Sequence, residues 1–289
     1  MNPKVIILGG GIAGLSAAHE LVERNFDVEV HELLSIPGGK ARSFRVPGTG
    51  IDGRKDLPGE HGFRFFPRFY RHVTDTMARI PCGPGNNGRV IDNLVDTTRC
   101  QLNRYGRHPI DVIARSPRTF TDVRAATTDL SHFLNGDLDL THDDLRFFGA
   151  KVWQIVTSCR ERRNEQYEKI GWWDFIGAEG RSPAYQKLLG HGITRSLVAA
   201  KARSASTKTI GDIFVQLLFD IVTPGPSTDR VLNGPTNEVW IEPWLRYLTS
   251  RGVAYHLGSK AVAVSFDGQR IRSATVSQGG RTVTKRKKV

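Results

Sequence analysis

The sequence predicts an α/β fold that begins with a strand, a glycine-rich turn, a helix and a second strand. Residues 5–8 form a short apolar run, and residues 15–23 carry apolar side chains at helical spacing. Between these two segments, residues 9–14 hold four glycines. Residues 26–31 read as the second strand, which is followed directly by the acid Glu32.

The glycines stand where a dinucleotide site needs them. Gly9 permits a tight turn, Gly11 lets the backbone approach a pyrophosphate, and Gly14 lets helix and strand pack closely. Amides at the start of the helix then face the phosphates. Glu32, eighteen residues after Gly14, is placed to bind the ribose and disfavours a 2′-phosphate. A tight corner without a ligand is the structural alternative, but the complete order of elements favours a Rossmann-like nucleotide site.

A second glycine pair, Gly38 and Gly39, follows the acid and continues into Lys40 and Arg42. This segment resembles the extension of the Rossmann motif in the family of FAD-dependent amine oxidases, phytoene desaturases and hydroxysqualene dehydroxylases. The resemblance implies FAD and a Rossmann-like FAD-binding domain of glutathione-reductase-type topology, with an inserted, mostly helical substrate or cap domain. Most members carry Arg or Lys two residues before the glycine pair, where this chain has Ile36. We expect Lys40 and Arg42 to meet the pyrophosphate instead.

Residues 57–67 resemble the Glu-His-Gly segment of the phytoene-desaturase-like branch, which runs close to the flavin ring. The resemblance implies that His61 and Arg64 lie near that ring. A cationic group there stabilises negative charge on reduced flavin or positions substrate. The alternative is local: His61 satisfies a turn, and Arg64 pairs with Glu60 or Asp56.

Phe63, Phe65 and Phe66 either line an apolar pocket for a polyene or terpenoid or belong to the core. No Ser-His-Asp arrangement and no HExxH or CxxC pattern can be read from the spacing, so we assign neither a catalytic base nor a metal site. We expect His19, inside the first helix, and His31, at a strand end, to be structural.

Shifts in composition divide the chain into three parts. Residues 1–84 are the first part of the FAD-binding domain, residues 85–225 the substrate or cap domain, and residues 226–289 the return to the FAD-binding domain. Segments rich in glycine and proline, at 82–88 and 224–226, mark the two boundaries.

Periodicity and capping residues predict the elements of the first two parts. Residues 46–68 are expected to form a loop past a ligand, and residues 68–80 a helix that stops at Pro81. Thr141 is an N-cap with acids in the following turn. The elements expected in the cap are helices that begin at residue 141 and span 183–202 and 209–222, and short strands within 90–102 and 108–113.

The last part is expected to return to the first sheet. A helix ends near residues 251–252, and strands follow at 253–257, 261–266 and 271–276. The resemblance, weaker in this region, implies that a backbone group near Ala261 meets the adenine.

Nothing in residues 277–289 matches the Gly-Asp-like segment with which family members complete their FAD site. Residues 282–284 lie about where the strand before that segment should begin. Three explanations are open: the chain is a fragment, a second chain supplies the remainder, or the nucleotide is bound differently. We favour the first two, and expect a site lacking one wall to hold flavin loosely.

The composition is typical of a soluble globular protein. The chain has 289 residues, 39% of them hydrophobic, and no apolar run approaches the roughly 18 residues that cross a bilayer. The first strand begins so close to Met1 that no signal peptide is expected, which indicates the cytoplasm. Cys82, Cys100 and Cys159 are odd in number and far apart, so we expect free thiols.

The chain is basic, with 41 basic against 29 acidic residues and a net charge of +12. No nucleic-acid motif accompanies this charge, and four basic residues stand together at 285–288. We therefore expect no nucleic-acid partner. A weak peripheral contact with an anionic membrane remains open.

The resemblance implies a cytoplasmic FAD-dependent oxidoreductase of the dehydrogenase or desaturase type, acting on a hydrophobic, carotenoid or terpenoid substrate. Two alternatives stay open. One is a flavin amine oxidase, and the other is a non-catalytic nucleotide-binding subunit that needs a partner chain.

Overall fold

The computed structural model describes residues 2–62, 64–114, 119–120, 124, 138–223 and 227–286. Phe63, the predicted break at 224–226 and part of the basic segment 285–288 therefore lie outside the described residues. The chain forms two compact units. Unit 1 comprises residues 1–66, 70–95 and 231–289, and unit 2 comprises residues 67–69 and 96–230.

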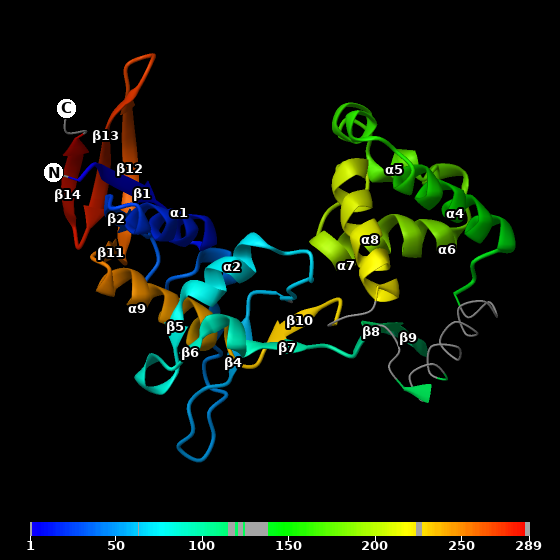
Figure 1. The fold of residues 1–289 in the computed structure, drawn as a ribbon, viewed down its shortest axis with the longest axis horizontal. Helices are drawn as coiled ribbons and strands as arrows, with labels where there is room; N and C mark the ends of the chain where they lie inside the picture. The colour runs from blue at the N-terminus through cyan, green and yellow to red at the C-terminus, as the bar shows by residue number, and fades with distance from the viewer. Residues whose placement is uncertain are drawn as a thin grey trace. The chain divides into compact units, whose positions relative to one another are not determined.

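The centre of unit 1 is a parallel sheet of three strands in the order β1–β2–β11, labelled in Figure 1. These strands are β1 (Lys4–Leu8), β2 (Asp27–His31) and β11 (Ala254–His256), so the sheet joins segments that are distant in the sequence. Helix α1 (Ile12–Glu23) connects β1 to β2, as expected for a βαβ unit. The α/β prediction for this part of the chain is confirmed.

The core of unit 1 lies between α1, the sheet and helix α9 (Glu242–Ser250), which packs against α1. Alternate residues of β2, Val28 and Val30, point into this core. Other fully buried members come from parts of the sequence before and after unit 2: Leu15, Ala18, Met77, Ile80, Ile241, Trp244 and Leu248.

Short elements connect the first βαβ unit to the rest of unit 1. Strands β3 (Ser43–Arg45) and β4 (Pro58–Glu60) pair in antiparallel fashion, so the predicted loop 46–68 contains a strand at its centre. The predicted helix at 68–80 is shorter in the structure, as α2 (His72–Arg79). The remaining pieces are η1 (Gly39–Ala41), β5 (Pro81–Cys82), η2 (Pro84–Asn86), β6 (Gly88–Arg89), η3 (Val90–Asn93) and the pair β7 (Leu94–Asp96) and β10 (Arg230–Leu232).

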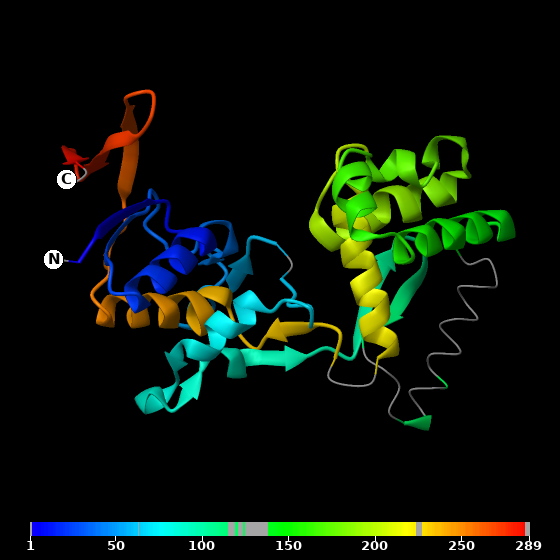
Figure 2. The same cartoon turned by 45° about the horizontal axis from the view of Figure 1, so that its top comes forward.

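A second sheet in unit 1 is antiparallel and consists of β12 (Ser259–Phe266), β13 (Ile271–Gln278) and β14 (Arg281–Arg286). In Figure 2 these strands, coloured orange to red, lie above the ribbon of β1 and α1. The strands expected at 261–266 and 271–276 are confirmed. Residues 282–284 pair with β13, so they form the third strand of this antiparallel sheet.

Unit 2 is mostly helical around an aromatic core. Its long helices are α4 (His142–Val156) and α8 (Thr207–Val222), and β8 (Arg99–Arg104) pairs with β9 (Arg107–Ile113). Shorter helical segments complete it: η4 (Arg162–Tyr167), α5 (Trp172–Phe175), η5 (Ala178–Gly180), α6 (Pro183–Tyr185), η6 (Gln186–Gly192) and α7 (Ile193–Val198). Trp172, Tyr167 and Tyr185 are fully buried at its centre.

Local capping explains where several elements begin and end. Thr141 accepts a hydrogen bond from the Asp144 amide at 3.0 Å, and the Thr141 amide donates to the Asp144 carboxylate, so the predicted N-cap of α4 is confirmed. The helix predicted over 183–202 ends at residue 198, because Ala199 adopts a left-handed conformation with φ 51°. The predicted strand over 90–102 is wrong at its start, where the Asp92 carboxylate accepts from the Arg89 amide and holds a helical turn.

Candidate functional site

The glycine-rich turn between β1 and α1 is shaped by its glycines. Gly9 has a φ of 108°, which favours glycine, and its amide donates to the His31 carbonyl at 2.8 Å. At Gly14, a Cβ atom would lie 1.9 Å from the Gly9 carbonyl oxygen. The close approach of α1 to the turn therefore depends on glycine at residue 14.

The first turn of helix α1 contains no acidic residue. Gly11 is the N-cap, makes no side-chain cap, and is extended with φ −73° and ψ −173°. The first amides of a helix have no intrahelical acceptor, and the helix dipole adds partial positive charge there. This end of α1 is suited to binding an anion.

The Glu32 carboxylate lies at the carboxyl end of β2, directly beside the glycine turn. Only 6% of the residue is exposed. Its Oε2 accepts from the Gly10 amide at 2.7 Å, and its Oε1 accepts from the Leu34 amide at 2.8 Å. Each carboxylate oxygen has capacity for one more hydrogen bond, so Glu32 can still accept from a ribose hydroxyl.

The second glycine pair packs directly on the first glycine turn. The Gly38 amide donates to the Gly10 carbonyl at 3.3 Å, and Gly38 forms a parallel bridge with Gly11. A Cβ atom on Gly39 would lie 2.9 Å from Cα of Gly11, so glycine is required for this contact. Gly38 and Gly39 both have positive φ, 101° and 57°. The two glycine segments thus form one continuous backbone surface.

Three basic side chains surround the segment after the glycine pair. Lys40 is exposed. Arg42 donates from Nη1 to the Gly39 carbonyl at 2.7 Å, so its guanidinium folds back onto its own turn. Arg64 donates from Nε to the Ala41 carbonyl at 3.0 Å and from Nη2 to the Lys40 carbonyl at 3.1 Å. Of these three side chains, Arg42 and Arg64 bind backbone carbonyls among the described residues, so Lys40 is the one that can turn toward a phosphate, whereas Arg64 holds the turn in place.

Asn237 and Tyr255 support the site from the other end of the chain, and no motif in the sequence marks them. The Asn237 Oδ1 accepts from the Ser43 amide at 2.8 Å, and its Nδ2 donates to the Pro37 carbonyl at 3.3 Å. The Tyr255 hydroxyl donates to the Gly10 carbonyl at 2.8 Å. Only the weak resemblance after residue 233 pointed to this region, and it marked neither residue.

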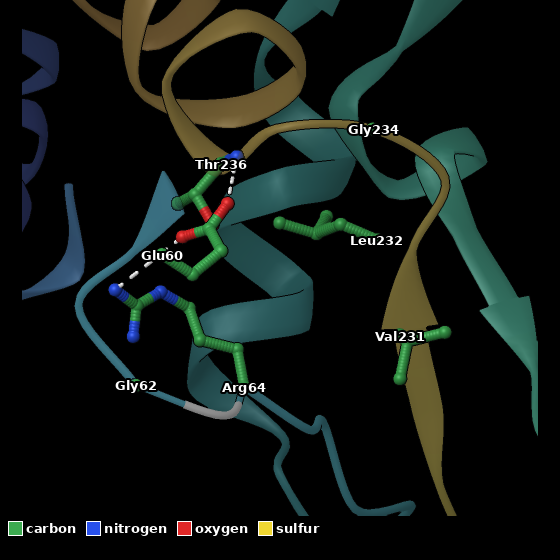
Figure 3. Close-up of a pocket in the computed structure, with 7 residues that line it drawn as sticks. All are labelled: Glu60, Gly62, Arg64, Val231, Leu232, Gly234 and Thr236. Carbon is green, nitrogen blue, oxygen red and sulfur yellow. Dashed lines mark hydrogen bonds and ion pairs between the residues drawn. The ribbon is translucent and has the colours of Figure 1, made fainter. Parts of the chain in front are cut away.

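A pocket of about 450 Å³ lies within unit 1, and Arg64, which holds the turn at residues 40–42, forms part of its lining (Figure 3). The Glu60 carboxylate accepts from the Thr236 amide at 2.8 Å and from its hydroxyl at 2.9 Å, and lies 3.6 Å from Arg64. The wall across from these groups in Figure 3 is apolar. The residues that line the pocket are Glu60, Gly62, Arg64, Val231, Leu232, Gly234 and Thr236.

The local partners of His61, Arg64 and Phe66 are visible in the structure. Arg64 pairs with Glu60, whereas Asp56 accepts from the amides of the 49–50 turn. His61 is exposed and meets the edge of Phe44, with ring centroids 6.1 Å apart. Phe66 is buried against Trp240, so it is a core residue of unit 1.

Ala261 lies on β12 and is exposed. Two residues earlier, the Ser259 amide donates to the Glu32 carbonyl at 2.7 Å, which ties the start of β12 to the end of β2. The adenine contact expected near Ala261 stays a prediction.

Two further expectations concern the whole chain. Among the residues that the structure describes, no helix is long and apolar enough to span a bilayer. Cys82, Cys100 and Cys159 are free thiols, as expected.

Comparison with known proteins supports a Rossmann-like domain at the start of the chain. Residues 7–80 match the family described as an NAD(P)-binding Rossmann-like domain. The chain is 24% identical to a zeta-carotene desaturase of Synechocystis sp. over 97% of its own length and 55% of that protein.

Two solved structures share the fold. An oxidoreductase from Methanosarcina mazei matches with a TM-score of 0.58 at 14% identity, over 97% of this chain and 56% of the other. A putrescine oxidase matches with a TM-score of 0.53 at 15% identity, over 98% and 56%. The chain thus spans about half the length of these relatives. The matches thus show that residues 7–80 form an NAD(P)-binding Rossmann-like domain, and that the chain is distantly similar over nearly its whole length to a carotenoid desaturase.

Proposed function

We propose that this chain binds FAD and forms part of an FAD-dependent oxidoreductase. The observation that carries the proposal is the packing of Gly38 and Gly39 on the first glycine turn, which leaves no space for a Cβ at Gly39. The first glycine turn would be enough to bind a single nucleotide. Gly38 and Gly39 extend the same backbone surface, as a dinucleotide such as FAD would require.

The residues present fit the ADP half of FAD. The start of α1 and the exposed Lys40 supply positive charge for the diphosphate. Glu32 supplies carboxylate lone pairs for the ribose hydroxyls. Arg64 and Asn237 hold the turn after the glycine pair, and they position rather than contact the nucleotide.

When bound, FAD would supply hydride or electron transfer, which is chemistry that the cofactor itself carries. The chain contributes binding and orientation. The resemblance of residues 57–67 implies that the ring lies near His61 and Arg64, and the pocket lined by Glu60 and Arg64 is adjacent to both.

We propose a hydrophobic substrate of the carotenoid or terpenoid kind. Val231 and Leu232 give the pocket an apolar wall, and its single carboxylate, Glu60, is already bound by Thr236 and paired with Arg64. An ammonium substrate would need a carboxylate that is not yet neutralised. The similarity to putrescine oxidase keeps a flavin amine oxidase as the second candidate.

The binding test is a titration of the purified chain with FAD, followed by flavin fluorescence and the visible spectrum. Glu32→Gln removes one carboxylate oxygen and the charge, so we expect FAD affinity to fall about tenfold or more. Glu165→Gln, at an exposed glutamate of unit 2, is the matched control and should bind as the parent chain does. Failure of the parent chain to bind FAD at any concentration would refute the proposal.

The substrate test compares two reductants under anaerobic conditions. Bleaching of the bound flavin by a polyene, but not by an aliphatic amine, would support a dehydrogenase that acts on a carotenoid or terpenoid substrate. The reverse result would support the amine oxidase. Binding of FAD with no bleaching by either class would favour the non-catalytic subunit.

The predicted partners stay proposals. A basic chain acting on a lipid-soluble substrate would gain from weak attraction to an anionic membrane. Co-sedimentation with anionic liposomes at low salt, and release at high salt, is the expected result. A second polypeptide that completes the cofactor site would be detected as an increase in FAD affinity when it is added.

A further inference from the structure

A cluster of metal-binding side chains lies on one face of the parallel sheet, near the ends of β2 and β11. Glu29 and His31 alternate on β2 and therefore point to the same face. On the neighbouring strand β11, His256 is directly opposite His31 in the register. Each of the three offers one ligand atom, and these atoms lie within 4.8 Å of one another. Sequence spacing could not reveal this set, because His256 is far along the chain.

Two of the three distances within the cluster suit a tetrahedral ion. Nε2 of His31 and Nε2 of His256 each lie 3.2 Å from Oε1 of Glu29. Metal–ligand bonds of about 2.0–2.1 Å place neighbouring ligands of a tetrahedron about 3.3 Å apart. The rings of His31 and His256 stack with centroids 4.9 Å apart.

The Nε2 atom of His31 belongs to this cluster and forms no hydrogen bond among the described residues. Only 3% of the residue is exposed, and its buried Nε2 makes no hydrogen bond with any described residue. Its other nitrogen, Nδ1, lies 2.8 Å from the Ser259 hydroxyl. Such an outer contact fixes the ring of a ligating histidine.

Two lysines complete the cluster and compete with a metal. The Lys285 ammonium lies 2.6 Å from Oε1 of Glu29, and Lys4 lies 2.9 Å from Oε2. Burial opposes ionisation of Glu29, but these contacts outweigh it and lower its pKa to about 2. An ion bound at Oε1 would have to displace Lys285, which is partly exposed and has a flexible side chain.

We propose that Glu29, His31 and His256 form a binding site for a divalent transition-metal ion of the zinc class, with Lys285 as the group it displaces. Two imidazoles and one carboxylate suit Zn²⁺ or Co²⁺, whereas Mg²⁺ and Ca²⁺ prefer sets of oxygen ligands. The partly exposed His256 gives the ion access from solvent. The ion would link β2 to β11.

The test is calorimetric titration of the full chain, without an affinity tag, with ZnCl₂ at neutral pH. We expect one equivalent to bind. His31→Gln and His256→Gln should each weaken binding at least tenfold, because each removes one of three ligands. Lys285→Gln should instead tighten binding, because it removes the competing charge. His72→Gln, at an exposed histidine on α2, is the matched control and should leave binding unchanged.

Co²⁺ gives a second readout that separates ligation from folding. The parent chain and Lys285→Gln should show the visible absorption bands of tetrahedral Co²⁺, and thermal unfolding in EDTA should show that each variant is folded. The proposal is overturned if zinc binds His31→Gln and His256→Gln as tightly as the parent chain. It is equally overturned if neither the parent chain nor Lys285→Gln binds zinc.

Discussion

Single atoms decide whether the first glycine turn can form. Gly14→Ala would place a Cβ 1.9 Å from the Gly9 carbonyl oxygen, so either α1 or the turn must move. We expect the free energy of unfolding to fall by about 1–3 kcal/mol, and FAD binding to weaken with it. Urea unfolding and flavin fluorescence measure the two effects.

Gly149→Ala is the matched control for this substitution. Gly149 also lies inside a helix, α4, but a Cβ there would meet nothing within 4 Å. Because alanine is the better helix former, this variant should gain up to about 1 kcal/mol. Equal effects at the two glycines would contradict the steric reading of Gly14.

Tyr255 fixes the same turn by a hydrogen bond from its hydroxyl to the Gly10 carbonyl. Tyr255→Phe removes only this donor. We expect a loss of about 0.5–1.5 kcal/mol in the free energy of unfolding, and weaker FAD binding. Tyr105→Phe, at a fully exposed tyrosine of unit 2, should change neither quantity. An unchanged FAD affinity in Tyr255→Phe would show that this bond does not hold the binding surface.

The sequence predicted the residues of the turn but not those that hold it. Gly9, Gly14 and Glu32 are close in sequence, and their spacing encodes a known local geometry. Tyr255 lies 245 residues from Gly10, and Asn237 lies 194 residues from Ser43. Such contacts arise only when the sheet has closed, so neither motif nor periodicity could show them.

At the scale of elements, α1 and α9 are joined by a buried histidine whose protonation should matter. The Trp244 indole donates to Nδ1 of His19 at 3.0 Å, and Nε2 of His19 lies 3.0 Å from Glu23. The neutral ring with a proton on Nε2 satisfies both contacts. Burial is the largest influence on the pKa of His19 and lowers it, partly offset by Glu23.

This lowered pKa gives the sign of the pH dependence. Below the ordinary histidine pKa of 6.5, the unfolded chain binds a proton that folded His19 resists. The stability contribution of His19 is therefore complete above that pH and is lost as the pH falls toward the lower, folded pKa. We expect the free energy of unfolding, measured in urea with EDTA present, to decrease from about pH 7 to about pH 5.5.

His19→Gln is the comparison, because an amide can accept from Trp244 and donate to Glu23 but does not titrate in this range. The variant should show a shallower loss of stability over the same pH interval. Identical slopes in the two proteins would exclude His19 as a source of the pH dependence.

Element prediction succeeded where one signal dominated and failed where backbone conformation decided. Apolar periodicity placed β1, α1 and α8 well. Periodicity wrongly extended the predicted helix past Ala199, whose left-handed backbone ends α7. It also predicted a strand over η3, where a carboxylate cap forms a helical turn instead. Periodicity did not predict the third strand of the antiparallel sheet, β14, because it has few apolar residues.

For the whole molecule, the proposed function makes a regional prediction. FAD should protect the amides of residues 9–15 and 38–42 in unit 1 from hydrogen exchange, because these segments form the proposed binding surface. Helices α4 and α8 of unit 2 should exchange at the same rate with and without it. At free FAD about 100-fold above its dissociation constant, binding stabilises the folded state by about 2.7 kcal/mol. That energy should appear as slower exchange in the core of unit 1. Protection spread evenly over both units, or confined to unit 2, would contradict the placement of the cofactor on the glycine segments.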